Sequence, residues 1–211
     1  MEDWVEKLLS LCKQFANLFY LNLLWIIFTC LGLLIFGIFP ATIAMFSVVR
    51  KWLIGEKEIP IFKSFWQTYK TEFVKSNILG LFFSLIGLVI YFDFHFFQSQ
   101  EGIVYFIWYA CFIMLSLLFL TMLLYFFPVF VHYELKLFQY IKQTLLMAIF
   151  QPLNSVLMLI GSIVTFTLSY YLRLFPFLSI IILVYFIMWM GLRTFRKVEQ
   201  YKVALAVSSD N

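Results

Sequence analysis

The chain has 211 residues, of which 64% are hydrophobic and only 12% are charged, and its formal net charge is +4. A soluble domain is about half apolar and about one quarter charged, and a globule of this length could not hide so large an apolar excess from water. The composition therefore excludes a soluble protein. It predicts an all-α integral membrane protein that forms one membrane domain over residues 1–211, without a soluble domain beside the spans.

Five apolar stretches are long enough to cross a bilayer, since a helix needs about 20 apolar residues to pass the hydrocarbon core. They are residues 18–39, 78–97, 103–127, 153–172 and 174–192. The first apolar run continues past Pro40 through residues 41–49. Because so short a piece cannot span by itself, we predict five spans. The alternative is that residues 41–49 re-enter the membrane.

The distribution of lysine and arginine predicts the orientation, because basic residues next to membrane spans stay in the cytoplasm. With five spans, one side carries twelve of these residues: six in residues 50–75, then Lys136, Lys142, Arg193, Arg196, Lys197 and Lys202. The other side carries three: Lys7, Lys13 and Arg173. We therefore predict a multi-pass protein of the cell membrane with a cytoplasmic C-terminus. If residues 41–49 re-enter, the N-terminus is cytoplasmic too and the ratio becomes fourteen to one.

Two segments between the spans have the pattern of amphipathic helices on the cytoplasmic membrane surface. In residues 62–75, aromatic side chains recur at helical spacing on one face and lysines lie on the other: Phe62, Phe65, Trp66, Tyr69 and Phe73 against Lys63, Lys70 and Lys75. An aromatic face opposite a basic face is typical of a helix on anionic lipid. Residues 135–151 show a weaker form of this pattern.

The order of these features indicates a parallel internal repeat over roughly residues 15–97 and 103–172, with the fifth span at 174–192 outside it. Each copy contains a span, a Phe-Pro pair, an amphipathic helix, an asparagine and a span with Ile-Gly. Pro40 and Pro128 belong to the two Phe-Pro pairs. Because proline removes a backbone donor and permits a bend, we interpret both as structural elbows. The alternative is that they act as functional hinges.

Four short motifs around the first basic segment carry a family resemblance. They are Phe39-Pro40-Ala41-Thr42, Val49-Arg50-Lys51-Trp52, Gly55-Glu56 and Asn77-x-x-Gly80. This pattern resembles the YesL family of bacterial membrane proteins, a family of unknown function, and length and hydropathy fit over the whole chain. Genes of that family often lie among those for carbohydrate uptake and breakdown. The resemblance therefore implies a role near a sugar importer, but no reaction and no catalytic residue.

Few polar groups lie in the apolar stretches. Asp93 and His95 are the one close acid and imidazole pair in a predicted span. An ionisable group in lipid is a candidate functional site, such as a proton relay, but the aromatic neighbours favour a hydrated pair at the interface. The sequence has no catalytic, cofactor or metal-binding motif, so we predict a protein that is not an enzyme and has no cofactor. We expect hydrogen bonds between helices from four asparagines: Asn17, Asn22, Asn77 and Asn154.

The leading functional hypothesis is a non-enzymatic accessory or regulatory protein associated with carbohydrate uptake, and the alternative is a small carrier that itself transports a solute. Carriers bind near the midplane, with broken helices and coupling-ion ligands, whereas the mid-span positions here are almost all apolar. The expected partners are anionic lipid head groups and a sugar import complex. Nucleic acid is not expected, because the aromatic face of the basic segment fits lipid better, and the oligomeric state stays open. The expected contact residues are Arg50, Lys51, Trp52, Lys63, Trp66, Lys70 and Lys75.

Overall fold

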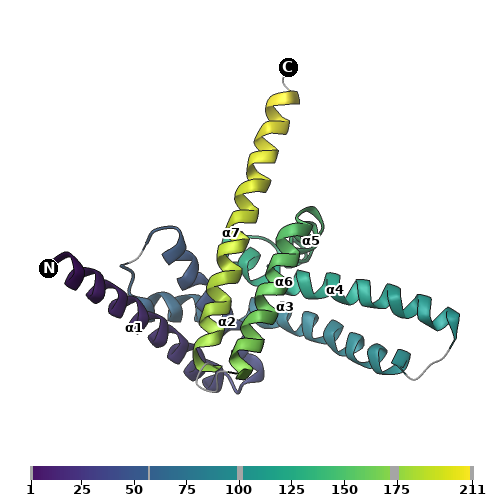
Figure 1. Cartoon of the computed structure of the whole chain (residues 1–211), viewed down its shortest axis with the longest axis horizontal. Coiled ribbons are helices and arrows are strands. Elements are labelled where there is room, and N and C mark those ends of the chain that lie inside the picture. Colours follow the sequence, from purple (N-terminus) through teal and green to yellow (C-terminus); the bar gives the residue numbers. More distant parts are fainter. Residues whose placement is uncertain (1, 57, 99–101, 172–175, 210–211) are drawn as a thin grey trace. The chain divides into compact units, whose positions relative to one another are not determined.

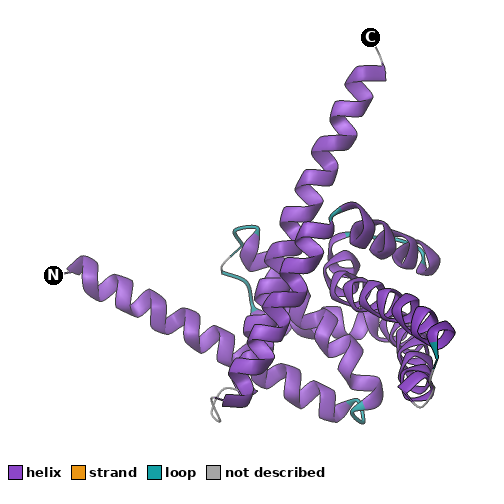
Figure 2. Cartoon of the chain, turned by 45° about the vertical axis from the view of Figure 1, so that its right-hand side comes forward, coloured by secondary structure: helices purple, strands orange, loops and turns teal. Residues whose placement is uncertain are grey.

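Seven α-helices build the part of the chain that the computed structural model describes, which comprises residues 2–56, 58–98, 102–171 and 176–209. No strand occurs among these residues (Figures 1 and 2), so the predicted all-α fold class is confirmed. In chain order the helices are α1 (Glu2–Leu31), α2 (Ile35–Leu53), α3 (Ile61–Gln98), α4 (Ile103–His132), α5 (Leu137–Phe150), α6 (Pro152–Tyr171) and α7 (Pro176–Ser209).

The helices form two compact units. The first unit comprises residues 1–73 and 161–189, and the second comprises residues 74–160 and 190–211. Three helices, α3, α6 and α7, therefore each contribute one part to each unit.

In the first unit, α1 and α2 form an antiparallel helical hairpin that closes at residues 32–34. Leu33 and Leu34 both have positive φ angles, 56° and 63°, and the Leu34 amide donates to the Thr29 carbonyl over 3.0 Å. Gly37 lies directly against the backbone of Thr29, where a Cβ would overlap. Further along the pair, Trp25 Nε1 donates to Thr42 Oγ1 over 3.0 Å. The absence of a side chain at Gly37 thus lets the two backbones touch.

This hairpin corrects the predicted boundaries of the first span. We expected residues 18–39 to cross the membrane as one helix, but α1 ends at Leu31 and α2 begins at Ile35. The prediction was wrong because two of the three turn residues, Leu33 and Leu34, are leucines, so the hydropathy of the run does not fall at the turn. The residues after Pro40 belong to a 19-residue helix that is long enough to span.

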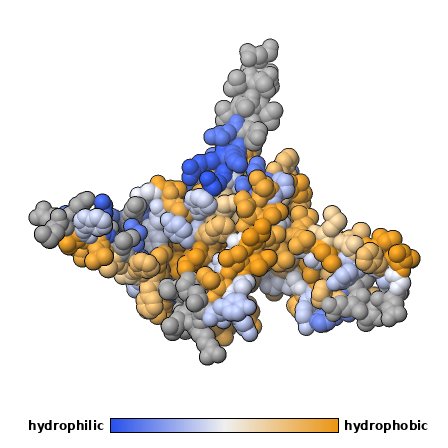
Figure 3. All heavy atoms as spheres, in the orientation of Figure 1, coloured by the Kyte–Doolittle hydropathy of each residue, from blue (hydrophilic) through white to orange (hydrophobic). Residues whose placement is uncertain are grey.

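Six helices in the described residues have the length and apolarity of membrane spans, namely α1, α2, α3, α4, α6 and α7. Figure 3 shows apolar side chains over much of the visible surface, as expected where lipid is the solvent. The chain is a polytopic helical membrane protein. The sixth span-length helix, compared with five predicted, is α2.

Of the two predicted surface helices, one is a separate helix in the structure and the other is not. Residues 135–151 correspond to a separate short helix, α5, of 14 residues. Residues 62–75 are helical too, but no break separates them from the span that follows, and α3 runs through 38 residues. At 1.5 Å per residue that helix is about 57 Å long, compared with a hydrocarbon core of about 30 Å. The prediction of a separate first surface helix was therefore wrong.

Neither Pro40 nor Pro128 ends a helix. Pro40 lies within α2, and Pro128 lies within α4, where it faces Gly191 of α7 at a close approach of the two helices. The chain turns at residues 32–34 and after His132 instead. A hinge function for the prolines stays a prediction, and so does the internal repeat.

A buried polar network connects α4, α6 and α7 in the second unit. Asn154 Nδ2 donates to Thr194 Oγ1 over 3.0 Å, and the Tyr125 hydroxyl lies 3.5 Å from the same oxygen. Tyr125 and Thr194 are fully buried. The prediction that Asn154 bonds between helices is confirmed. Asn22, by contrast, is buried with no hydrogen-bond partner for its side-chain oxygen.

Candidate functional site

The start of α3 packs against the hairpin through a cluster of aromatic rings around Phe28 of α1. The ring centroid of Phe28 lies 5.3 Å from that of Phe65, 5.4 Å from Trp66 and 5.1 Å from Tyr69. The Tyr69 hydroxyl also donates to the Phe28 carbonyl over 3.2 Å. Phe65 and Tyr69 are buried, so the prediction that this whole aromatic arc faces lipid is wrong for these two rings. These two rings pack against Phe28 of α1 instead.

The other side of the same helical segment is open. Phe62 is 50% exposed and Trp66 is 44% exposed, and Lys63 and Lys70 are exposed beside them. Positions three and four apart are neighbours on a helix, so these side chains form one continuous strip. We call it the α3 face: Phe62, Lys63, Trp66 and Lys70. It retains the combination of apolar rings and cations that suits an anionic surface.

Three further predicted contact residues, Arg50, Lys51 and Trp52, lie in the last turn of α2. Cations at this end of a helix are favoured by its dipole. Lys51 Nζ donates to Ser64 Oγ over 2.8 Å, which connects α2 to α3 within the first unit. The structure therefore brings six of the seven predicted contact residues into one unit.

The seventh, Lys75, belongs to the second unit and has protein partners. Its Nζ donates to the Tyr140 hydroxyl over 3.1 Å and lies 4.7 Å from the centroid of the Tyr140 ring. Tyr140 in turn donates to the Tyr133 carbonyl over 2.8 Å and accepts from the Leu135 amide over 3.2 Å. One buried hydroxyl thus joins α3, the loop after α4 and α5. Sequence reasoning missed this role of Tyr140 because its partners are backbone groups of an irregular segment.

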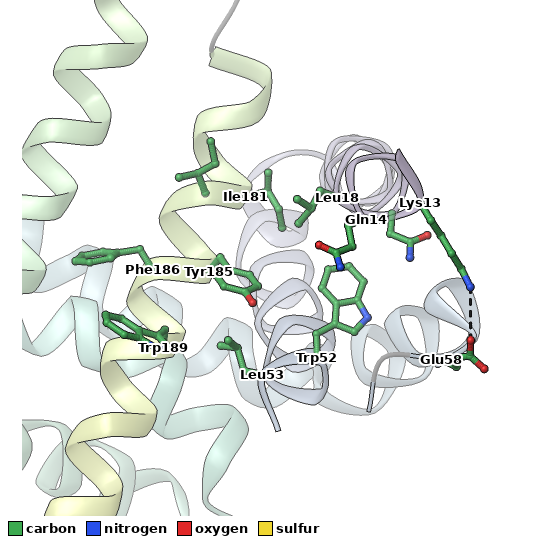
Figure 4. Close-up of a pocket in the computed structure, with 12 residues that line it drawn as sticks. Lys13, Gln14, Leu18, Trp52, Leu53, Glu58, Ile181, Tyr185, Phe186 and Trp189 are labelled. Atoms are coloured by element: carbon green, nitrogen blue, oxygen red, sulfur yellow. Dashed lines mark ion pairs between the residues drawn. The ribbon is translucent and has the colours of Figure 1, made fainter. Parts of the chain in front are cut away.

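A groove of about 910 Å³ lies in the first unit, among α1, the end of α2 and α7. Figure 4 shows a charged pair, Lys13 and Glu58, at one end, 3.5 Å apart. Trp52 and Gln14 follow, and Tyr185 of α7 points toward Trp52. The remaining lining residues are mostly apolar or aromatic: Asn17, Leu18, Leu53, Ile181, Ile182, Phe186 and Trp189. Only Trp52 of this set was expected to be functional, since the others come from segments far apart in the sequence.

Comparison with known proteins places the chain in a family. The family described as "Protein of unknown function, DUF624" matches residues 18–94. Three relatives from Bacillus subtilis (strain 168), each described as an uncharacterized protein, are similar over most of their length. YesV is 40% identical over 92% of this chain and 94% of its own, and YteU is 38% identical over 92% and 88%. YesL is 36% identical over 72% of this chain and 71% of its own.

The chain belongs to the YesL family. No solved structure matches it. The segment matched by the family description, residues 18–94, contains the hairpin turn, α2, the α3 face and Lys75. The resemblance that the sequence motifs indicated is therefore confirmed. The Tyr140 contact and the part of the groove formed by α7 lie outside that segment.

The predicted intramembrane pair of this YesL-family protein, Asp93 and His95, lies in the last two turns of α3. Asp93 is half-buried and His95 is exposed near the end of α3, and residues two apart on a helix do not face each other. His95 packs edge-on against Tyr91 at 4.7 Å between ring centroids. Within the described residues, no three His, Cys, Asp or Glu side chains are grouped so that they could hold a metal ion.

A second acid and imidazole pair occurs where α4 ends. His132 Nε2 lies 3.9 Å from Glu199 Oε1 of α7, and the His132 ring stacks on Phe195 at 4.6 Å. Burial raises the pKa of the neighbouring Tyr133 to about 12, and the negative charge of Glu199 adds to this increase. The Tyr133 phenol therefore stays protonated at physiological pH. These groups connect the end of α4 to α7.

Proposed function

We propose that this protein is a non-enzymatic protein of the cell membrane that serves carbohydrate uptake as an accessory or regulatory component. The observation that carries the proposal is the α3 face. It lies on a helix about 57 Å long, of which the hydrocarbon core accommodates only about 30 Å. The exposed rings and cations of the α3 face are therefore available at the membrane surface, where they would contact anionic lipid and a sugar import complex.

The charge distribution supports a cytoplasmic position for this surface. With six spanning helices the N-terminus and the C-terminus lie on the same side, and fourteen of the fifteen Lys and Arg lie there with them. Only Arg173, which falls outside the described residues, is on the other side. Figure 3 shows a hydrophilic patch on α7 beyond its apolar part, where Arg193, Arg196 and Lys197 occur in the sequence. Such a bias supports a cytoplasmic position for that side.

Cysteine labelling tests this arrangement. In a background without Cys12, Cys30 and Cys111, single cysteines at positions 5, 63 and 142 should resist an impermeant thiol reagent on intact cells. A cysteine at position 101 should react, because the proposed six-span arrangement puts the connection between α3 and α4 outside. All four should react after the cells are permeabilised. Labelling of position 5 on intact cells would contradict the six-span arrangement, and labelling of position 63 but not 101 would reverse the orientation.

A charge-reversal experiment in the native host tests the accessory role. Deletion of the gene should impair growth on one carbohydrate of a tested panel while the importer subunits remain present at normal levels. The variant with Lys63→Glu and Lys70→Glu should reproduce this defect. Its matched control, Lys136→Glu with Lys142→Glu, makes the same change in net charge elsewhere and should support growth. Normal growth of the first variant on every carbohydrate of the panel would contradict a function of the α3 face.

The groove in the first unit favours the second candidate, a carrier that itself transports a solute. Reconstitution in liposomes distinguishes the carrier function from the accessory function. The protein alone in liposomes should take up no labelled maltose above empty liposomes, since polar solutes need several convergent hydrogen-bonding groups along their path. Uptake that is abolished by Gln14→Ala would replace the accessory function with the carrier function.

A further inference from the structure

We propose that the groove of the first unit binds an amphiphile with a neutral, hydroxyl-rich head group and an apolar chain, such as a glucosyl diacylglycerol. The head group would lie between Trp52 and the Lys13–Glu58 pair, and the first part of the chain would lie along α7. This inference goes beyond the proposed function and does not depend on it, since a bound lipid of this class requires no import complex.

The size of the groove fits part of a lipid. Ligand sites commonly occupy about 300–1,000 Å³ and are mostly apolar, with a few polar groups that fix orientation. The groove has about 910 Å³, enough for a sugar ring and the adjoining part of a chain. The rest of the lipid would remain in the bilayer, which these spanning-length helices adjoin.

The polarity of the lining changes from one end to the other. Lys13 and Glu58 carry charges at the first end, and Gln14 and Asn17 offer amide groups that can both donate and accept. Toward α7 the lining changes to Leu18 and to the isoleucines and aromatic rings of that helix. Buried hydroxyl groups require partners, which the first end supplies. An apolar chain suits the second end. This gradient matches an amphiphile better than a soluble sugar.

The charge balance selects a neutral head group over a phosphate. Among the lining residues that the structure describes, Lys13 is the one cation, and it is paired with Glu58 at 3.5 Å. An anionic phosphate would have to compete with that carboxylate and would be repelled by it. Hydroxyl groups have no such conflict, because they can donate to Glu58 and accept from Lys13 without breaking the pair.

The aromatic side chains provide surfaces for the C–H face of a sugar ring. Trp52 is half-buried at the centre of the groove, and Tyr185 and Trp189 of α7 are each 41% exposed. Large aromatic rings contribute apolar contact area, and a phenol or indole adds a polar edge. Trp52 and Tyr185 point toward the same space in Figure 4. A ring-shaped head group with apolar faces and hydroxyl edges fits against Trp52 on the side of the Lys13–Glu58 pair, and the adjoining chain would pass Tyr185.

Lipid competition followed by native mass spectrometry tests the proposal. The full chain is extracted in a detergent without a sugar head group and placed in phosphatidylcholine nanodiscs that contain equal fractions of glucosyl diacylglycerol, diacylglycerol and phosphatidylglycerol. We expect the glucosyl lipid to be retained about tenfold over each of the others, as one or two extra hydrogen bonds would give. Trp52→Leu and Gln14→Ala should each reduce its retention about fivefold or more. Gln14 is exposed, so its replacement should leave the fold intact.

A matched tryptophan variant supplies the control. Trp108 of α4 is 63% exposed and lies outside the groove, so Trp108→Leu should retain the glucosyl lipid as the native protein does. If phosphatidylglycerol were retained as strongly as the glucosyl lipid, the preference for a neutral head group would be disproved. If diacylglycerol were retained as strongly, the sugar would have no role in binding. If soluble glucose competed for the groove as effectively as the glucosyl lipid does, the apolar chain would not contribute to binding, and the proposal of an amphiphilic ligand would be wrong. If Gln14→Ala and Trp52→Leu retained the glucosyl lipid as the native protein does, the groove would not be its binding site.

Discussion

Gly37→Ala should separate α1 from α2 and destabilise the protein by about 3 kcal/mol or more. The added Cβ would overlap the Thr29 carbonyl oxygen and would lie 2.9 Å from both the Thr29 Cα and the Phe28 carbonyl oxygen. All three are backbone atoms, so no side-chain rotation can relieve the contact. Overpacking of a tight contact costs about 1–3 kcal/mol and occasionally more, and here the whole hairpin would have to shift. Denaturant unfolding in a mild detergent measures the effect.

Gly87→Ala is the matched control for this prediction. A Cβ at Gly87 would meet its nearest neighbours, two ring atoms of Phe119, at 3.9 Å, an ordinary contact distance. Alanine also favours a helix over glycine by about 1 kcal/mol. The control should therefore leave stability unchanged or raise it. Equal effects of the two substitutions would show that the close approach of α1 and α2 at Gly37 is not what fixes the hairpin.

Tyr140→Phe should destabilise the protein by about 2 kcal/mol or more. The substitution keeps the ring, and with it the stacking on Phe130 at 4.8 Å. It removes only the hydroxyl that accepts from Lys75 and Leu135 and donates to the Tyr133 carbonyl. Each buried polar group that loses its partner costs about 1–3 kcal/mol. The same unfolding measurement reports the loss.

The control for Tyr140 is Tyr170→Phe, since the Tyr170 side chain is 83% exposed. It should change the free energy of unfolding very little. A double-mutant cycle with Lys75→Met then isolates the part of the effect that belongs to the Lys75 contact. If Tyr140→Phe proved as mild as Tyr170→Phe, the hydroxyl would not be the group that joins α3, α4 and α5.

The sequence predicted the features that depend on composition. An apolar excess requires lipid as solvent, which led to the all-α membrane fold. A polar group in a membrane helix needs a partner, which led to the hydrogen bond of Asn154. The turn at Leu33 and Leu34 was not predictable in this way, because hydropathy cannot distinguish a leucine in a turn from a leucine in a span. The glycines at positions 32 and 37 were the available signals.

Two other features could not be predicted from the sequence, because they depend on tertiary packing. The start of α3 has the amphipathic pattern of a surface helix, but the ring of Phe28 in α1 packs against Phe65 and Tyr69 on its aromatic side. The same pattern is compatible with lipid and with protein as the apolar neighbour. The groove combines Lys13, Trp52 and Tyr185 from three helices, and without long-range contacts no local pattern connects them.

The continuity of α3 has a mechanical consequence. Sharp kinks in helices arise at proline, at glycine or at inserted side chains and waters, and α3 contains no proline and has no glycine before Gly80. Between the α3 face and Lys75 the helix therefore contains neither a proline nor a glycine at which it could kink. No loop interrupts the backbone between Lys63 and Lys75, so a change in direction of the chain between these two residues would require the helix itself to bend.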